Sequence, residues 1–181
     1  TPYRSNWSPE RAVSDGLERV VWVYACVLAI AADESRLPIR WLKGHPETGD
    51  EIKPKAEPLW KLLNRRANPF ESAQAFRFRL SCQLLLCKQG VYVELQRARD
   101  GSIKGLYLLP PHRTAPIPDP DTFVAGYEVY GSQGEIYRLP PEKVLWIKRP
   151  HPLDPYLGLT PMEAAGLAVD VDFYARLYNR N

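Results

Sequence analysis

The sequence has few of the residues that build disulfide, metal or membrane-spanning structures. It contains three cysteines, three histidines and one methionine in 181 residues. An odd, small number of cysteines in apolar surroundings predicts reduced, buried thiols in a cytoplasmic protein. The longest uncharged apolar run covers residues 20–32, shorter than the roughly 20 apolar residues that a membrane helix needs. Residues 1–5 show no basic region followed by an apolar run, so no signal peptide is expected.

An excess of charge of one sign is also missing. Lys and Arg number 24 and Asp and Glu number 21, which leaves a net charge of +3. This excess is too small to indicate nucleic-acid binding, which usually shows a concentrated basic patch. Hydrophobic residues make up 45% of the chain, which supports a packed core rather than wholesale disorder. The length predicts one domain, or one domain with an appendage.

Motifs for catalysis or metal binding are absent as well. The sequence has no glycine-rich phosphate loop and no nucleophile elbow. His45, His112 and His151 lie beside or near prolines, and none has a second histidine at ligand spacing. Cys82 and Cys87 are expected about 140° apart around one helix, which favours core packing over gripping one metal ion. We therefore expect no catalytic residue, no metal and no cofactor.

Proline, in contrast, is abundant. The 18 prolines cluster around residues 110–120, 140–141 and 150–161. Because proline lacks an amide donor and avoids central strands, these stretches are expected to be turns, sheet edges and connectors.

The first regular element is expected over residues 17–32, where apolar residues recur at helical spacing. Trp22, Cys26 and Ile30 make this helix apolar nearly all round, which predicts burial on more than one side. For Cys26 this means a buried thiol. A strand over residues 20–24 remains open on propensity alone.

Two more helices are expected before the main strands. The first is short and covers residues 57–66, with leucines on one face. The second begins at Asn68-Pro-Phe-Glu71, where Asn can cap and Pro suits the first helical position; Ser72 is a competing cap. It runs to about Gln89 and is ended by Gly90. Its apolar stripe is Phe76, Leu80, Leu84 and Cys87.

Short strand-like runs predict a small, mainly antiparallel sheet packed on these helices, and hence an α+β fold. The sequence Arg99-Asp-Gly-Ser102 is a strong hairpin signal between two of the runs. The expected strands cover residues 37–43, 91–97, 103–109, 123–130, 135–139 and 144–148.

A long C-terminal helix is expected from Thr160. Thr160-Pro-Met-Glu163 is a capping box with proline at the first helical position. We expect three parts: an N-terminal arm over residues 1–16, an α+β domain over residues 17–159 and this helix over residues 160–181. No stop signal follows, so the helix is expected to continue beyond Asn181.

Together and in this order, these signals resemble those of tailed-phage portal proteins of the HK-type siphovirus branch. Each motif alone is weak, but their order makes the resemblance specific over Val23 to Asn181. Ala75, Val91 and the final Asn-Arg-Asn depart from the family pattern. The matching segments are Val23–Val27, Leu59–Asn64 with Asn68-Pro69, Phe76–Tyr92, Leu106–Arg113, Leu139–Leu145, Gly158–Ala165 and Phe173–Asn179.

This resemblance implies a structural subunit and not an enzyme. Portal proteins form a dodecameric ring at one capsid vertex and conduct double-stranded DNA without sequence preference. They dock the terminase large subunit, contact the major capsid or scaffolding protein, and later bind head-completion or adaptor proteins. The resemblance implies a place in the virion after assembly in the host cytoplasm, with no membrane partner. The α+β part would be the portal wing, and the helix from Thr160 the start of the channel-lining stem.

Two sets of functional residues follow from this interpretation. Arg176 and Arg180 are the candidates to face DNA, with ion pairing between subunits as the alternative. The surplus apolar surface of residues 20–32 favours contact with a neighbour. The candidates for subunit contacts are Trp22, Cys26, Ile30, Phe173 and Leu177. Two other hypotheses remain open: an interaction module of another head–tail protein, and a small α+β enzyme.

Overall fold

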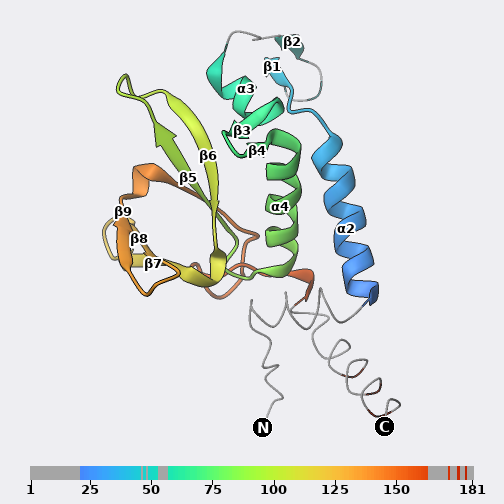
Figure 1. The fold of residues 1–181 in the computed structure, drawn as a ribbon, viewed down its shortest axis with the longest axis vertical. Coiled ribbons are helices and arrows are strands. Elements are labelled where there is room, and N and C mark those ends of the chain that lie inside the picture. The colour runs from blue at the N-terminus through green and yellow to red at the C-terminus, as the bar shows by residue number, and fades with distance from the viewer. Residues whose placement is uncertain are drawn as a thin grey trace.

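The computed structural model describes residues 21–45, 47, 49–52, 57–162, 171, 175 and 178, and Figure 1 shows their fold. The helices are α2 (Val21–Arg36), α3 (Pro58–Asn64) and α4 (Ala73–Leu86). Short 3-10 turns lie at η2 (Pro111–Arg113) and η3 (Pro141–Lys143). The strands are β1 (Trp41–Lys43), β2 (Asp50–Ile52), β3 (Arg66–Asn68), β4 (Glu71–Ser72), β5 (Val91–Arg97), β6 (Ile103–Leu109), β7 (Thr114–Asp119), β8 (Phe123–Tyr130), β9 (Ile136–Leu139) and β10 (Val144–Ile147).

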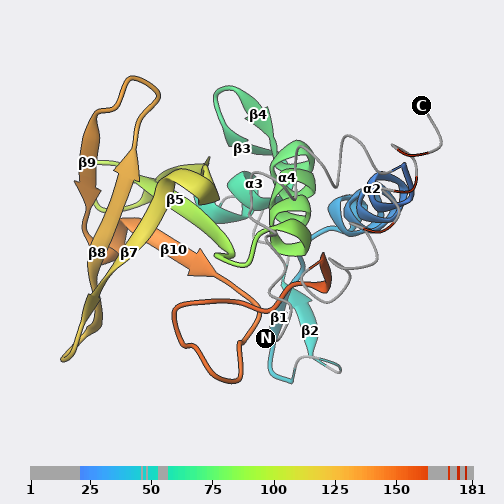
Figure 2. The ribbon, with the colours of Figure 1, turned by 90° about the horizontal axis from the view of Figure 1, so that it is seen from below.

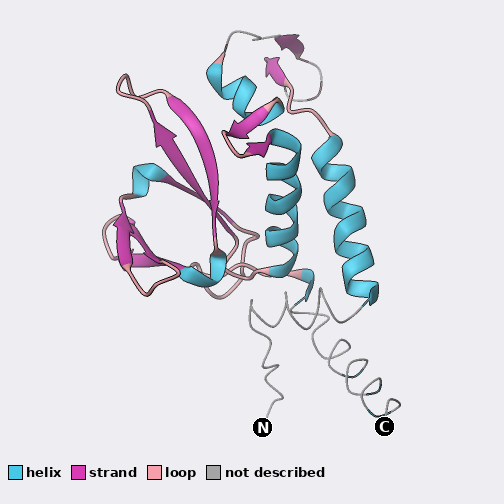
Figure 3. Cartoon of the chain, viewed as in Figure 1, coloured by secondary structure: helices cyan, strands magenta, loops and turns pink. Residues whose placement is uncertain are grey.

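The strands form four small antiparallel sheets. Two are hairpins, β1–β2 and β3–β4, and two have three strands, in the orders β10-β5-β6 and β7-β8-β9. Figure 3 shows the two three-stranded sheets on one side of the molecule, and the three α-helices with the two hairpins beside them on the other. The predicted α+β class with antiparallel pairing is confirmed, although one sheet was expected and the strands divide into four.

The elements stack in layers, with α4 between α2 and the two three-stranded sheets (Figures 1 and 2). One side of α4 packs on α2 through Val23, Val27, Leu85 and Leu86. Its other side meets β5 and β6, where Phe76 packs with the core. A helix apolar on two sides is what such a middle layer requires.

Strand β5 is the centre of the sheet side because both of its faces are buried. Val91 and Val93 point toward α4, as their alternation predicts, while Tyr92 points into the core between the two three-stranded sheets. The ring of Tyr92 stacks on Trp146 at 5.6 Å and meets the edge of Tyr127 at 5.7 Å. These aromatic contacts join β5 and β10 to β8.

The predicted start of α4 at Asn68 is wrong. The helix begins at Ala73, and its cap is the competing candidate Ser72, whose hydroxyl accepts from the Ala75 amide at 3.1 Å. Asn68 instead closes the β3–β4 turn by accepting from the Phe70 amide at 2.9 Å. Asn and Ser serve turns and caps equally well, so local sequence does not separate the two roles.

The predicted end of α4 at Gln89 is three residues too late, because the helix stops at Leu86. Gly90 lies in the turn that follows, with φ +79, in the left-handed region that glycine adopts most readily. A Cβ there would collide with the carbonyl oxygen of Ile147. Gly90 therefore allows β10 to lie close beside this turn.

The remaining predicted strands are mostly confirmed. β5, β6 and β8 match in full, while only residues 41–43 of the predicted strand 37–43 are extended in a sheet. The expected strands omit β2, β3, β4 and β7. Of these, β7 lies in the proline-rich segment and is an edge strand, where proline is tolerated. The division into residues 1–16, 17–159 and 160–181 stays a prediction, since the arm and most of the last helix lie outside the described residues.

Candidate functional site

Helix α2 carries two parallel strips of side chains, each repeating every four residues, so that each follows one line along the helix. The inner strip is buried and comprises Val23, Val27, Ala31 and Ser35. The outer strip is exposed and comprises Trp22, Cys26, Ile30 and Glu34. Trp22 and Ile30 are 40% and 45% exposed. The helix therefore presents an apolar line to solvent for most of its length.

This exposure corrects part of the sequence interpretation. Residues 21–24 are helical, which excludes the alternative strand. The helix is buried on one side within this chain and not on several. Trp22 was expected in the core and Cys26 as a buried thiol, and both are exposed. Their separate prediction as subunit contacts remains a prediction.

Arg77 of α4 fixes the ends of two helices. Its guanidinium donates to the carbonyl oxygen of Ser35 at 2.7 Å and to that of Leu63. These carbonyls lie in the last turns of α2 and α3, where the helix dipole is negative. Burial lowers the pKa of Arg77, but a guanidinium remains charged at neutral pH. Arg77 thus sets the position of α2 and its outer strip.

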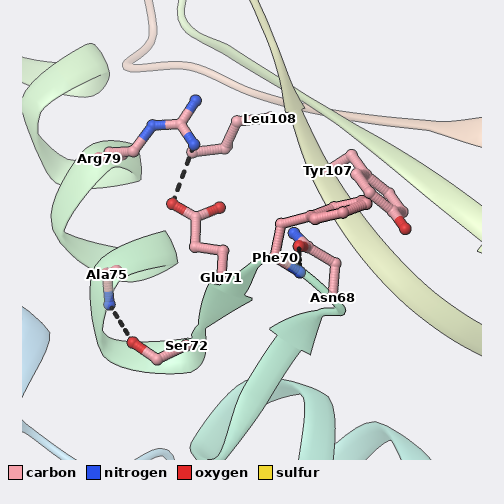
Figure 4. Close-up of a pocket in the computed structure, with 8 residues that line it drawn as sticks. All are labelled: Asn68, Phe70, Glu71, Ser72, Ala75, Arg79, Tyr107 and Leu108. Carbon is pink, nitrogen blue, oxygen red and sulfur yellow. Dashed lines mark hydrogen bonds and ion pairs between the residues drawn. The ribbon is translucent and has the colours of Figure 1, made fainter.

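A second exposed feature is the β3–β4 hairpin, which borders an open pocket of about 440 Å³ (Figure 4). Asn68 fixes the hairpin by donating to the Leu106 carbonyl at 2.8 Å. Glu71 pairs with Arg79 across the pocket at 2.9 Å. Phe70, at the turn, is 89% exposed. The sequence interpretation missed this feature because Asn68-Pro69-Phe70 was assigned to a helix start.

The residues that line the pocket include one ion pair, between Glu71 and Arg79, and the exposed ring of Phe70. An open hollow beside an exposed aromatic residue suits contact with another protein surface better than chemistry.

A third exposed feature is the outer face of β8 and β9, two strands that lie on the side of the molecule opposite α2 (Figures 1 and 2). Tyr130 pairs with Ile136, and Glu128 pairs with Arg138, so that these four side chains share one face. Ile136 is 58% exposed. Arg138 donates twice to Glu128, at 3.0 and 2.7 Å. We call this set the outer sheet face.

A loop over residues 149–158 fixes the approach to Thr160. The Tyr156 ring stacks on Phe123 at 4.6 Å, and its hydroxyl donates to the Phe123 carbonyl at 2.9 Å. The Gly158 amide donates to the Lys88 carbonyl at 2.6 Å. These bonds place residues 160–162 beside the α4–β5 turn, where Met162 joins the α2–α4 core.

The histidines and cysteines do not gather. His45 and His151 each accept backbone amide hydrogens within their own turns, and His112 lies exposed in η2. Cys82 is half-buried and Cys87 buried. Within the part of the chain that the structure describes, no three metal-ligating side chains converge.

Four of the predicted site residues, Arg176, Arg180, Phe173 and Leu177, lie outside the described residues. Among the described helices, none is long and apolar enough to span a bilayer.

Comparison with known proteins gives consistent matches. A family model described as phage portal protein matches residues 21–181. Among solved structures, a chain in the neck of an empty GTA particle, computed with C6 symmetry, is 26% identical with a TM-score of 0.79, over 98% of this chain and 47% of the other. A chain in the neck of a native GTA particle, computed with C12 symmetry, is 26% identical with a TM-score of 0.77, over 98% and 46%.

Two curated relatives are uncharacterized proteins of Rickettsia. The protein of Rickettsia bellii (strain RML369-C) is 30% identical over 92% of this chain and 42% of its own length. That of Rickettsia felis (strain ATCC VR-1525 / URRWXCal2) is 31% identical over 89% and 41%. The chain thus spans less than half the length of these relatives.

Proposed function

Because the chain belongs to the phage portal protein family, we propose that it is a structural subunit of a portal ring at the vertex of a phage or phage-like particle. The observation that carries this proposal is the family match over residues 21–181 together with the likeness to particle necks. Both support a structural role within a particle. The ring would contain twelve copies and would have no catalytic activity of its own.

The proposed ring conducts double-stranded DNA during packaging and ejection. A conduit must let DNA slide, so its contacts should be weak and independent of sequence, as contacts to phosphates are. Arg176 and Arg180 are the proposed DNA-facing residues, on the helix expected from Thr160. The loop over residues 149–158 supports this because its hydrogen bonds to the body fix where residues 160–162 lie.

The outer strip of α2 is the proposed contact between subunits. Trp22, Cys26 and Ile30 form an apolar line that this chain leaves exposed, and a ring of identical copies supplies a neighbour to cover it. Phe173 and Leu177 are proposed to extend this contact.

The proposed external partners are the terminase large subunit, the major capsid or scaffolding protein, and head-completion or adaptor proteins. The exposed β3–β4 hairpin, with Phe70 at its turn, supports docking of a further protein, because the turn is already fixed by Asn68 and loses little freedom on binding. Assembly would take place in the cytoplasm of a bacterial host.

Disruption of the gene in the producing cell tests this function. We expect particles from the disrupted strain to contain no DNA. In the undisrupted strain, immunogold labelling of the protein should mark a single vertex of each intact particle. Labelling distributed over the whole shell, or particles that still package DNA without the gene, would contradict a portal function. Labelling confined to the tail would instead indicate another head–tail protein.

A further inference from the structure

We propose that the outer strip of α2 in one copy packs on the outer sheet face, formed by β8 and β9, of the next copy. This inference rests on the proposed ring and names the surface that meets α2. The contact is heterologous, which means that two different patches meet, and repetition of such a contact closes a ring.

The chemistry of the outer strip changes along its length. Trp22, Cys26 and Ile30 are apolar or weakly polar, and Glu34 ends the line with a negative charge. The carboxylate of Glu34 makes no ion pair with any residue that the structure describes. The nearby Asp33 is already 3.8 Å from Arg36. Glu34 therefore remains available to a cation from outside the chain.

The outer sheet face has the complementary order. Ile136 and Tyr130 lie together at one end, and the Glu128–Arg138 pair lies next to them. Within that pair the Arg138 side chain is 73% exposed and the Glu128 side chain 25% exposed. The guanidinium is thus the outermost charge, and an acid from a neighbour would meet Arg138 first.

The positions of the two patches suit a ring. Figures 1 and 2 share a horizontal axis, and in both α2 lies at the right and β8–β9 at the left. Neighbours in a twelve-membered ring are rotated by about 30°, so the two contact surfaces of a subunit must lie on nearly opposite flanks. Helix α2 and the β8–β9 pair, which carry the two patches, meet this condition, whereas the β3–β4 hairpin lies between them.

The spacing of the side chains matches as well. Ile30 and Glu34 are separated by about 6 Å along the helix axis. Ile136 and Arg138 are separated by about 6.6 Å along the strand. When Ile30 of one copy lies against Ile136 of the next and the axes align, Glu34 comes opposite Arg138. The proposal therefore predicts one ion pair across each subunit boundary.

Charge reversal in the intact gene product tests this pairing. Glu34→Arg and Arg138→Glu are each expected to lower the ring fraction about tenfold, since like charges then face each other. The double variant, made together with Glu128→Gln to remove the like charge that Arg138→Glu would meet within its own chain, restores the pair in reverse and is expected to recover the ring. Glu57→Arg is the matched control, because Glu57 is exposed and caps α3 without a side-chain hydrogen bond. Combined with Arg138→Glu it should not restore the ring.

Native mass spectrometry of these variants separates the outcomes. Loss in both single variants with recovery in the double variant supports the pairing. Rings that form equally in all variants, or no recovery in a double variant whose circular dichroism matches wild type, overturn it while the portal function stands. A wild-type product that never forms a ring instead removes the proposed function on which the pairing rests.

Discussion

The two strips of α2 are neighbours on one helix, and each runs from apolar residues to a polar one, but their surroundings differ. Val27 of the inner strip is buried against α4, whereas Cys26, the preceding residue, is exposed. An apolar face on a helix does not reveal, from sequence alone, whether it packs within the same chain or against another one. The buried strip holds α2 in the fold, and the exposed strip is the surface that we propose a neighbouring subunit covers.

The largest expected effect of a single change is in the inner strip. Val27→Asp places an unpaired charge between α2 and α4 and is expected to lower the free energy of unfolding by about 4 kcal/mol. The matched change Cys26→Asp is expected to cost about 0.5 kcal/mol or less, as at other exposed sites. Urea unfolding monitored by circular dichroism measures both, and equal costs would show that the two strips do not differ.

A smaller loss is expected where Arg77 holds the end of the inner strip. Arg77→Ala removes the charged hydrogen bonds to the carbonyls of Ser35 and Leu63 and should cost about 2 kcal/mol. Arg79→Ala is the control, since Arg79 is 53% exposed and makes a single ion pair, with the largely covered Glu71 side chain, and its loss should cost about 1 kcal/mol. Hydrogen exchange in the last turn of α2 should rise in the first variant alone.

Alkaline pH probes the core between the two three-stranded sheets, where Tyr92 and Tyr127 are buried. Burial raises the pKa of Tyr92, with a further rise from Tyr127, and burial also raises the pKa of Tyr127. In the folded state both hydroxyls therefore stay protonated at pH values above about 10, where the unfolded chain releases these protons. Stability is fully present below pH 10 and should fall above it, by up to about 1.4 kcal/mol per pH unit for each tyrosine.

Urea midpoints measured between pH 8 and pH 11 check this dependence. Tyr92→Phe should reduce the slope above pH 10 and cost little at neutral pH, because the buried Tyr92 hydroxyl has no hydrogen-bond partner among the residues that the structure describes. An unchanged slope in this variant would mean that Tyr92 does not remain protonated in the folded state.

The smallest effect concerns thiol reactivity and leaves stability unchanged. Cys26 is exposed in the single chain, whereas Cys87 is buried. Maleimide should therefore label Cys26 rapidly in dissociated subunits and slowly in the ring, while Cys87 stays slow in both. Cys26→Ser should abolish the rapid phase. Equal labelling of Cys26 in subunits and rings would place the outer strip outside the subunit contact.

Much of the fold follows from local signals. Alternation located β5, and the Asp100-Gly101 turn located the β5–β6 hairpin. The start of α4 was not predictable, because Asn68 and Ser72 both suit a cap and only the tertiary bond from Asn68 to the Leu106 carbonyl decides between them. β7 was missed because prolines suppress strand signals without excluding an edge strand.

The candidate site was only partly predictable. Helical spacing identified Trp22, Cys26 and Ile30 as surplus apolar surface, but it did not show which face of α2 meets α4. The outer sheet face was missed because Tyr130 and Ile136 meet through strand pairing, which their separation in sequence does not reveal. Arg77 gave no signal, since its partners are backbone carbonyls of two distant helices.

The native mass of the intact gene product tests the central claim most directly. Native mass spectrometry at neutral pH and moderate salt should give a closed ring of identical subunits, with a mass twelve times that of one chain, as expected for a portal. A product that remains a monomer at every protein and salt concentration would contradict the claim.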